Sequence, residues 1–347
     1  MGHDVPMGTP SDRRTFDRST TTEEVLDGVD LHGRRAVVTG AASGLGFESA
    51  RAMAAHGAAV TVVARNPERA WGAAEQLRQL VPGADVEAGV ADLGDLATIR
   101  AFADDFLGRH DRIDVLLNNA GVMACPFGRT TDGFETQFGT NHLGHFLLTS
   151  RLMPAVLAAP SPRVVTLSSA GHSRSDVDLE DPNFESTQYS PWLAYGRAKT
   201  ANALFARELA TRYGGRGLLS YSVHPGGIVT ELGRHLNQEL IDEMLSFADE
   251  RSDQAARRRG DGATDDSEPR GMRFKSVDAG AATQVWAATS DDPELLSHNG
   301  AYLADCGLGV LDADPGANGF RPYLLDDDTA AALWSLSEDL VGEPFLS

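Results

Sequence analysis

The sequence predicts an α/β fold in which a doubly wound parallel β-sheet carries helices on both faces. Two observations predict this fold. Short apolar runs rich in β-branched residues alternate with helical stretches of about 10 to 15 residues, a pattern typical of right-handed βαβ units. A glycine-rich turn joins the first predicted strand of this alternation to the helix that follows it. The 347 residues suffice for one large domain with insertions.

The alternation begins after residue 33 and is regular through the first half of the chain. A short apolar run ends at the glycine turn, and an alanine-rich helical stretch follows it. The next apolar run is rich in valine, and Pro67 then stands in the first turn of a helix, where the proline ring is tolerated. The predicted strands are 36–38, 58–64, 85–90 and 113–117, and the helices between them are 44–56, 67–80 and 93–107.

The second half continues the pattern with one interruption. Residues 246–271 are charged and nearly devoid of apolar side chains, a composition that predicts a mobile surface insertion. We therefore divide the chain into an N-terminal arm (1–33), a main domain (34–305) with a substrate lid (231–275), and a C-terminal extension (306–347). In the arm, helical potential is confined to 22–26. The remaining predicted elements are helices 143–157, 192–213 and 279–289 and strands 164–167, 218–223 and 300–303.

Composition and charge exclude several classes of protein. The net charge of −20 leaves nothing to neutralise a phosphate backbone, so we expect no nucleic-acid partner. Two cysteines, Cys125 and Cys306, cannot build a disulfide framework or a four-ligand zinc site, and we expect no metal. Residues 1–30 are polar, and the longest apolar stretch, 146–159, is shorter than the roughly 20 residues that span a bilayer. We expect a cytoplasmic protein without a membrane anchor.

The glycine-rich turn predicts a dinucleotide site. Glycines between a strand and a helix let the backbone approach a pyrophosphate, whose charge lies at the positive end of the helix. The alternative is a plain tight turn. The second strand ends in Ala64 and Arg65, where an NAD-binding protein usually places an acidic residue. A guanidinium there favours a 2′-phosphate, so NADP(H) is preferred over NAD(H), unless Arg65 is simply solvated.

Tyr195 and Lys199 lie four residues apart on a predicted helix and therefore share one of its faces. A tyrosine pKa is ordinarily about 10, and a nearby ammonium would lower it toward neutrality, so the pair suits proton transfer. Such a pair alone is more often part of a helix surface. Lys199 is one of only two lysines in the chain, and the pair follows a predicted cofactor-binding half, so we favour the catalytic interpretation.

Several motifs occur together in an order that resembles the short-chain dehydrogenase/reductase family over about 31–286. They are T-G-x-x-x-G-x-G at 39–46, N-N-A-G at 118–121, Y-x-x-x-K at 195–199 and P-G at 225–226. Within the family, the segments 140–146, 167–172 and 223–226 are most similar to the retinol-dehydrogenase-like branch. The resemblance implies a Rossmann-type fold, and it implies an oxidoreductase that interconverts an alcohol and an aldehyde or ketone by hydride transfer.

The resemblance also implies a catalytic tetrad. Tyr195 would be the acid/base, and Lys199 would hold the nicotinamide ribose and lower the tyrosine pKa. Ser169, rather than Ser168, would bind the substrate oxygen, and Asn141 would hold a proton-relay water. Asp92 would contact the adenine, although it could instead cap a helix. The implied cofactor-binding residues are Gly40, Ser43, Gly44, Leu45, Gly46, Arg65, Asp92, Leu93, Asn119, Ala120, Gly121, Tyr195, Lys199, Pro225, Gly226, Ile228 and Thr230.

The segment after the P-G turn would cover the substrate. Its apolar side chains favour a lipophilic small molecule, or else they pack a helix onto the body. They are Leu232, Leu236, Leu240, Ile241, Met244, Leu245 and Phe247. Residues 173–189 would form a loop beside the pocket.

Two other functions stay open. They are a non-catalytic NADP(H)-binding regulator and a reductase of an activated carbon–carbon double bond. A homodimer or homotetramer is also expected, because helices like those that carry Asn141 and Tyr195 form dimer interfaces in many members of the family.

Overall fold

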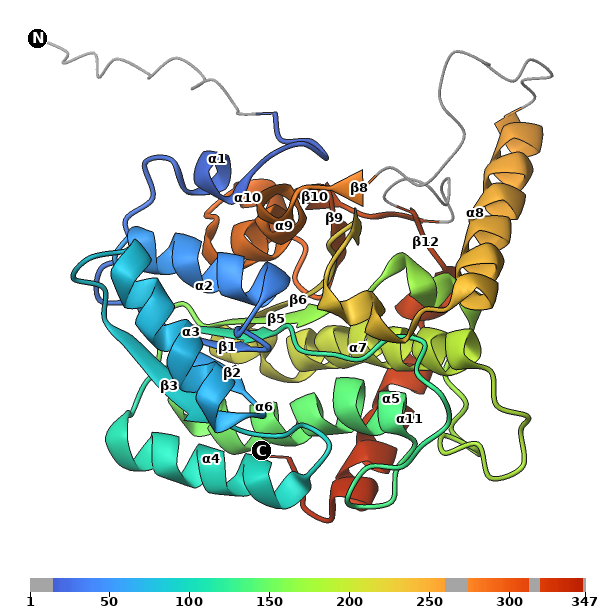
Figure 1. The fold of residues 1–347 in the computed structure, drawn as a ribbon, viewed down its shortest axis with the longest axis horizontal. Helices are drawn as coiled ribbons and strands as arrows, with labels where there is room; N and C mark the ends of the chain where they lie inside the picture. Colours follow the sequence, from blue (N-terminus) through green and yellow to red (C-terminus); the bar gives the residue numbers. More distant parts are fainter. Residues whose placement is uncertain (1–14, 260–273, 312–318, 346–347) are drawn as a thin grey trace, which may run out of the picture.

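A mostly parallel β-sheet forms the centre of the protein, as the sequence predicts (Figure 1). The computed structural model describes residues 15–259, 274–311 and 319–345. Within these residues, eight strands pair in the order β10-β9-β6-β5-β4-β1-β2-β3, and β10 alone runs antiparallel to its neighbour. The strands are β1 (Arg35–Thr39), β2 (Ala59–Ala64), β3 (Val86–Val90), β4 (Val115–Asn118), β5 (Arg163–Leu167), β6 (Leu219–His224), β9 (Tyr302–Ala304) and β10 (Gly307–Leu308).

Helices cover both faces of this sheet because successive strand residues point to opposite sides. On β1, for example, Val37 belongs to one core cluster and Val38 to the other. One face is covered by α1 (Thr22–Leu26), α2 (Gly44–Ala55), α3 (Pro67–Leu80) and α9 (Val277–Thr289). The other face is covered by α4 (Leu96–Arg109), α6 (Gly144–Leu157), α7 (Pro191–Tyr213) and α11 (Asp327–Val341).

Short elements complete the described chain. Single helical turns and two-residue strands occupy the loops between the main elements. The helical turns are α5 (Thr136–Phe138), α10 (Pro293–Leu296), η1 (Gly139–Leu143), η2 (Ala170–Arg174), η3 (Gly214–Arg216), η4 (Glu231–His235) and η5 (Pro322–Leu325). The short strand pairs are β7 (Gly227–Ile228) with β8 (Phe274–Lys275), and β11 (Val310–Leu311) with β12 (Gly319–Phe320).

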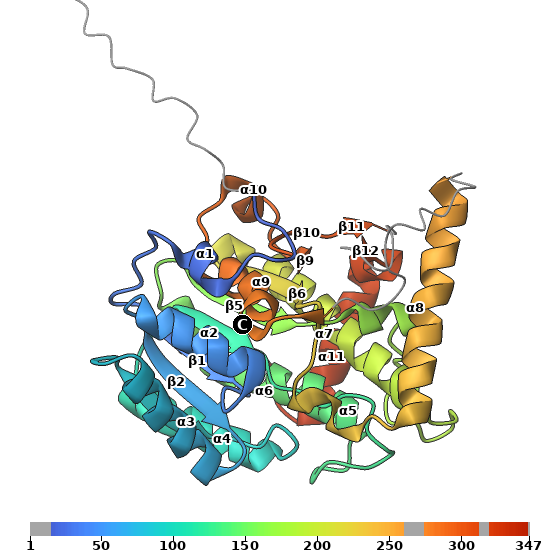
Figure 2. The same cartoon turned by 45° about the horizontal axis from the view of Figure 1, so that its top comes forward.

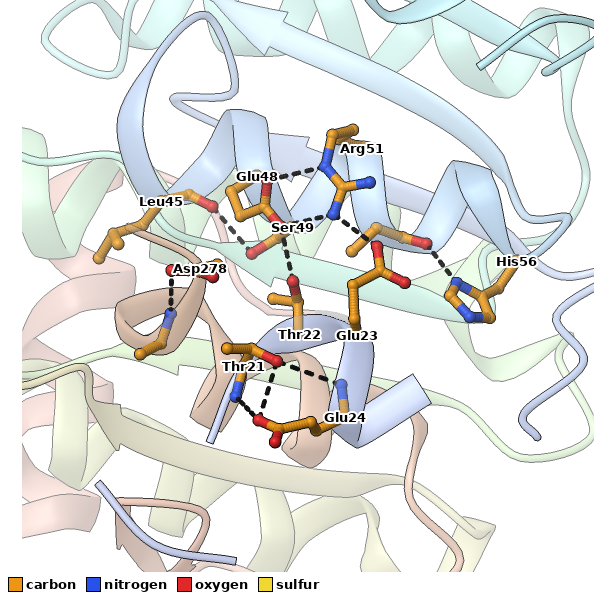
Figure 3. Close-up of polar contacts among 12 residues, drawn as sticks. Thr21, Thr22, Glu23, Glu24, Leu45, Glu48, Ser49, Arg51, His56 and Asp278 are labelled. Atoms are coloured by element: carbon orange, nitrogen blue, oxygen red, sulfur yellow. Dashed lines mark hydrogen bonds and ion pairs between the residues drawn. The ribbon is translucent and has the colours of Figure 1, made fainter. Parts of the chain in front are cut away.

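The N-terminal segment differs from the expected arm. Helix α1 packs against α2 and α9, and both Leu26 and Leu31 are buried in the core. Figure 3 shows the polar side of this contact, where the Thr22 hydroxyl donates to the Glu48 carboxylate at 2.5 Å. Arg51 donates to Glu23 at 2.7 Å and to Glu48 at 2.8 Å. A few well-spaced apolar side chains are therefore enough to hold this mostly polar segment against the main domain. Residues 1–14 of the predicted arm lie outside the described part.

The predicted insertion also differs in part. Helix α8 extends over Gln238–Arg259, so the residues from 246 to 259 are helical rather than irregular. Alanine, glutamate, glutamine and arginine recur in this stretch and have high helix propensity, which a reading for apolar periodicity overlooks. Helix α8 stands at the edge of the molecule, and its C-terminal half projects beyond the body (Figures 1 and 2). The remainder of the predicted insertion, 260–271, lies outside the described residues.

The C-terminal extension is part of the core. Helix α11 lies across α7, and the rings of Trp334 and Phe345 contact each other at 4.3 Å between centroids. Both also pack against Phe146 of α6, each with centroids 5.2 Å from the Phe146 ring. The chain thus covers the helices on this face of the sheet with its own last described helix.

We expect Trp334→Ala to lower the free energy of unfolding by about 3 to 5 kcal/mol, because it leaves a cavity where an indole only 2% exposed now packs. The control is Trp71→Ala, whose side chain is 61% exposed and whose loss should change stability by less than about 0.5 kcal/mol. Urea denaturation measures both. Equal losses in the two variants would show that α11 contributes little to the core.

Candidate active site

The predicted site residues gather at the carboxyl ends of the parallel strands. Residues 40–46 follow β1, residues 119–121 follow β4, and Ser169 and the 225–230 segment follow β5 and β6. In a parallel sheet these ends lie along one edge, where open α/β folds bind their ligands. The order of β1, β4, β5 and β6 in the sheet therefore places segments far apart in sequence beside one another.

The glycine turn rests directly on the Asn119–Ala120 segment. A Cβ built on Gly40 would lie 2.8 Å from the Ala120 Cα, so only glycine fits this approach. The Thr39 hydroxyl accepts hydrogen bonds from the backbone N–H groups of Asn119 (2.9 Å) and Ala120 (3.0 Å). The Asn119 amide donates back to the Thr39 carbonyl at 2.8 Å. These bonds fix the shape of the glycine turn.

This turn fits the phosphates of a dinucleotide. Ser43 precedes the first turn of α2 in an extended conformation and makes no side-chain cap hydrogen bond to the helix. The first N–H groups of α2 thus lack a side-chain cap from Ser43, and such groups attract anions. Gly44 has a φ of +57°, which an L side chain rarely adopts.

Asn141 lies in a π-helical turn, η1, at the start of α6. Its side chain is fully used: the oxygen accepts from the Val122 N–H at 2.8 Å, and the amide donates to the Val122 carbonyl at 3.0 Å. Its backbone carbonyl is 2.9 Å from Nδ1 of His145, whose Nε2 lies 2.9 Å from the Thr39 hydroxyl. Asn141 therefore holds the loop after β4 and is linked to the glycine turn through His145.

Tyr195, Ser169 and Lys199 converge beside this loop. The Ser169 hydroxyl forms a hydrogen bond with Tyr195. The Tyr195 ring lies against Gly171, where a Cβ would come within 2.8 Å of two ring carbons. The Lys199 ammonium is 5.7 Å from the centre of the Tyr195 ring and donates to the Leu167 carbonyl at 2.9 Å. With Asn141, which lies across Gly121 from the Lys199 ammonium, the four residues of the predicted tetrad come to one place from η1, the N-terminal end of η2 and α7.

The pKa values in this cluster differ from the expectation for Tyr195. Burial raises the pKa of Tyr195 to about 12, and only the Ser169 hydrogen bond opposes this rise. Burial also lowers the pKa of Lys199 to about 8. The expected lowering of the tyrosine pKa by the lysine is absent because the ammonium faces the Leu167 carbonyl rather than the phenol oxygen.

Hydrogen bonds to neighbouring residues hold the Ser169 loop in place. The Ser168 hydroxyl donates to the Lys199 carbonyl at 2.8 Å, which ties the loop to α7. His172 Nδ1 lies 2.6 Å from the Ser169 carbonyl, and the Tyr323 hydroxyl donates to the His172 carbonyl at 2.6 Å. Tyr323 belongs to the C-terminal extension, so that extension supports the site as well as the core.

Arg65 follows β2 and is exposed. In the first turn of α3, Arg69 lies beside the glycine turn: its guanidinium is 3.5 Å from the Ser43 hydroxyl and 2.7 Å from the Glu231 carboxylate. The sequence analysis missed Arg69. The four-residue spacing from Arg65 was the available signal, because it places two cations at the start of one helix.

Asp92 and Leu93 follow β3. The Asp92 carboxylate accepts from the Gly94 N–H at 2.9 Å, while Asp95 caps α4. The helix-cap alternative for Asp92 is therefore wrong, because α4 begins at Leu96 rather than at Leu93. Leu93 is buried and packs where Gly144 begins α6.

The 225–230 segment closes the site from the other side. Gly226 has a φ of +100°, and a Cβ there would lie 2.9 Å from the side chain of Lys275. Ile228 packs against Gly280 of α9 together with Leu45. Thr230 faces the glycine turn, 3.5 Å from where a Cβ on Gly44 would lie. Pro225 precedes this turn.

Helix α8 covers Tyr195 with apolar side chains. Leu236, Leu240 and Met244 pack against a cluster formed by Met123, Ala124, Trp192 and Tyr195. The Trp192 indole N–H donates to the Leu240 carbonyl at 3.1 Å. Three of the predicted lid residues thus face the tyrosine, whereas Leu245 is exposed.

Arg174 clamps α8 to the body. Its guanidinium lies 4.8 Å from the Trp192 ring centre and 4.1 Å from that of Phe247, and it donates to the Glu243 carboxylate at 3.0 Å. The chain between η2 and α7 is irregular, as predicted for most of 173–189, and Tyr189 in it donates to the Cys125 carbonyl at 2.8 Å.

The remaining candidates are structural. His142 and His145 are fully buried, and burial lowers their pKa values to about 3 and about 4, so both rings are neutral. Cys125 and Cys306 are buried free thiols. In the described part of the chain, no group of histidine, cysteine or acidic side chains could hold a metal ion.

The cluster around Tyr195 beside a glycine turn, on a doubly wound sheet, is the arrangement expected of a nicotinamide-dependent oxidoreductase. The family model for short chain dehydrogenase matches residues 34–241. The chain therefore belongs to the short-chain dehydrogenase/reductase family. This family binds a nicotinamide cofactor, and the chain is an oxidoreductase that interconverts alcohol and carbonyl groups of a small-molecule substrate.

The most similar relatives point to one branch of the family. Retinol dehydrogenase 12 of Mus musculus is 35% identical over 96% of this chain and 93% of its own length. Short-chain dehydrogenase/reductase prx1 of Penicillium roqueforti is 38% identical over 87% of this chain and 83% of its own. The chain thus belongs to the retinol-dehydrogenase-like branch. Across the described residues, no helix is both long and apolar enough to cross a membrane.

Solved structures support the fold. A crystal structure of an uncharacterized protein from Mycobacterium paratuberculosis is 34% identical, with a TM-score of 0.68 over 93% of this chain and 98% of that one. Gluconate 5-dehydrogenase from Burkholderia cenocepacia, in complex with NADP and tartrate, has a TM-score of 0.58 at 23% identity, covering 80% of this chain and 96% of its own. At that identity the likeness concerns the fold alone.

Removing the Arg174 clamp should loosen the lid. We expect Arg174→Gln to speed amide hydrogen exchange in residues 238–247 about fivefold, since it removes two cation–π contacts and an ion pair. The control is Arg78→Gln, which removes only an exposed pair with Glu75 on α3. Unchanged exchange in the Arg174 variant would mean that the apolar contacts alone hold α8.

Proposed function

We propose that this protein is an NADP(H)-dependent oxidoreductase that interconverts a lipophilic alcohol and its aldehyde or ketone, with Tyr195 as the acid/base. The observation that carries the proposal is the cluster of Tyr195, Ser169 and Lys199 beside Asn141, at the sheet edge where the glycine turn lies. When bound, the nicotinamide supplies the hydride. The chain's own residues supply position, polarity and the proton.

Each member of the cluster has a role that its contacts suit. The Tyr195 hydroxyl donates its proton to the carbonyl oxygen during reduction and removes it during oxidation. Ser169 and Tyr195 together stabilise the developing negative charge on that oxygen by hydrogen bonding. Lys199 holds the nicotinamide ribose, and its ammonium group stabilises the negative charge that develops on the Tyr195 oxygen as the proton moves. Asn141 holds a proton-relay water at its backbone carbonyl.

The preference for NADP(H) is supported by charge. Arg65 and Arg69 are two guanidinium groups at the end of β2 and the start of α3, and that of Arg69 lies 3.5 Å from the Ser43 hydroxyl. Guanidinium groups bind a 2′-phosphate by charge-assisted hydrogen bonds. The residues proposed for the rest of the cofactor are those of the glycine turn, the 119–121 and 225–230 segments, and Asp92 with Leu93.

A lipophilic substrate is supported by the lid. The surface above Tyr195 is formed by Leu236, Leu240 and Met244, with Met123 and Trp192 beside them. Pockets lined in this way bind apolar molecules with few oriented polar groups. The homodimer or homotetramer stays a prediction. Because α11 lies across α7, a dimer through α7 would have to include α11 in its interface.

Tyr195→Phe should abolish turnover while keeping the fold. In an assay of NADPH oxidation with lipophilic aldehydes and ketones, we expect kcat/KM to fall by about 10² to 10⁴, because the general acid is lost. Tyr213→Phe is the matched control, since Tyr213 lies on the same helix, α7, and packs against Trp334 far from Ser169.

The same assay separates the alternatives. Turnover of enones without turnover of saturated carbonyls would favour reduction of a carbon–carbon double bond. Tight NADPH binding with no turnover by wild type would favour the regulatory function. Turnover that prefers NADH would contradict the charge argument for Arg65 and Arg69.

The pKa of Lys199 predicts the pH dependence of carbonyl reduction. Its value of about 8 lies below the ordinary lysine value, so the ammonium form dominates below about pH 7, is half lost at about pH 8 and disappears above that. The Tyr195 hydroxyl, with a pKa of about 12, stays protonated throughout this window. We expect kcat/KM for reduction to be flat from about pH 6 to 7, to be halved near pH 8 and to fall about tenfold per pH unit above about pH 9.

Lys199→Arg tests this assignment. A guanidinium stays charged at all these pH values, so the remaining activity should show no break near pH 8. A break that persists in this variant would have to come from another group.

A further inference from the structure

The lid segment places a carboxylate at the phosphate-binding corner of the glycine turn. Glu231 is the first residue of η4, directly after Thr230. Its carboxylate accepts from the Arg69 guanidinium at 2.7 Å and from the Ser43 hydroxyl at 3.4 Å. The same guanidinium lies 3.5 Å from the Ser43 hydroxyl, so the three groups form one compact triad.

The surroundings of this triad are those of an anion site. Ser43 is the residue before the first turn of α2, where the helix dipole favours negative charge, and it makes no side-chain cap to that helix. Hydrogen bonding to Arg69 is the main cause that lowers the pKa of Glu231 below its ordinary value, and Ser43 acts in the same direction. Arg65 and Arg234 add positive charge nearby, acting on His235 and Glu231 respectively.

We infer that Glu231 is an internal competitor for the 2′-phosphate and therefore a residue that sets the preference between NADP(H) and NAD(H). This inference rests on the proposed use of NADP(H). A 2′-phosphate that binds Arg69 and Ser43 must take the hydrogen bonds that the Glu231 carboxylate now accepts. Two anions cannot share that corner without repulsion, so NADP(H) binding has to move Glu231 away. A cofactor without the 2′-phosphate leaves the Glu231–Arg69 pair in place.

The contact between Glu231 and Arg69 also links the surroundings of the glycine turn to the lid. The η4 turn that Glu231 begins ends at His235, and Leu236, which follows, already packs in the cluster above Tyr195. The side chain that yields to the phosphate and the side chains that cover the substrate therefore belong to one short segment. When the 2′-phosphate replaces the Glu231 carboxylate at Arg69, the N-terminal end of that segment loses its contact with α3.

The experiment measures the Kd of NADPH and NADH by cofactor fluorescence in four proteins: wild type, Glu231→Gln, Arg69→Met and the double variant. We expect Glu231→Gln to lower the Kd of NADPH about threefold to fivefold, because the Glu231–Arg69 ion pair that it removes is exposed and therefore weak. The Kd of NADH should be unchanged. Arg69→Met should weaken NADPH binding, and the added Glu231→Gln change should then restore nothing. Glu75→Gln, which removes another exposed carboxylate–arginine pair on α3, is the matched control and should change neither Kd.

Other outcomes overturn the inference in distinguishable ways. Unchanged NADPH affinity in Glu231→Gln, with wild type binding NADPH, contradicts the inference and leaves the proposed function intact. An equal gain for NADPH and NADH would place Glu231 against the pyrophosphate instead. A loss of NADH affinity alone would mean that Glu231 binds the ribose hydroxyls. Failure of wild type to bind NADPH would overturn both the inference and the proposed function.

Discussion

The hydroxyl of Thr39 lies where the two halves of the site meet. It accepts from the backbone of Asn119 and Ala120 and lies within hydrogen-bond distance of His145, which in turn reaches the carbonyl of Asn141. One buried oxygen thus joins the glycine turn after β1, the loop after β4 and the start of α6. Because buried polar groups are costly when left unpaired, each partner fixes the others. The positions of the glycine turn and of Asn141 are set by this one small network.

Burial changes the titration of the groups around Tyr195. It moves the pKa of Tyr195 upward and that of Lys199 downward, so each side chain is shifted toward its neutral form, although Lys199, with a pKa of about 8, is still mostly charged at pH 7. The charge of such a buried group responds strongly to what binds beside it. The apolar lid over Tyr195 adds to this effect by excluding water.

The sequence was sufficient to predict the sheet, the order of its main elements and the residues that the fold brings together around Tyr195. Strand and helix periodicity is local, and the motifs occupy fixed places at strand ends. Contacts that depend on distant parts of the chain were not predictable in this way. Leu26 is buried because α2 and α9 lie against α1, and Arg69 became a candidate only once Ser43 and Glu231 were found beside it. Residues 246–259 form a helix, but their sequence has no apolar side chains recurring at helical spacing, so the pattern did not predict it.

Helix α11 and the residues after it cover α6 and α7 through Trp334 and Phe345, although they follow every strand of the main sheet in the chain. Without this cover, the aromatic rings of Phe146 and Phe205 would be open to solvent. Exposed apolar patches of this kind recruit chaperones or other chains. Docking of α11 therefore protects the folded molecule from unwanted association.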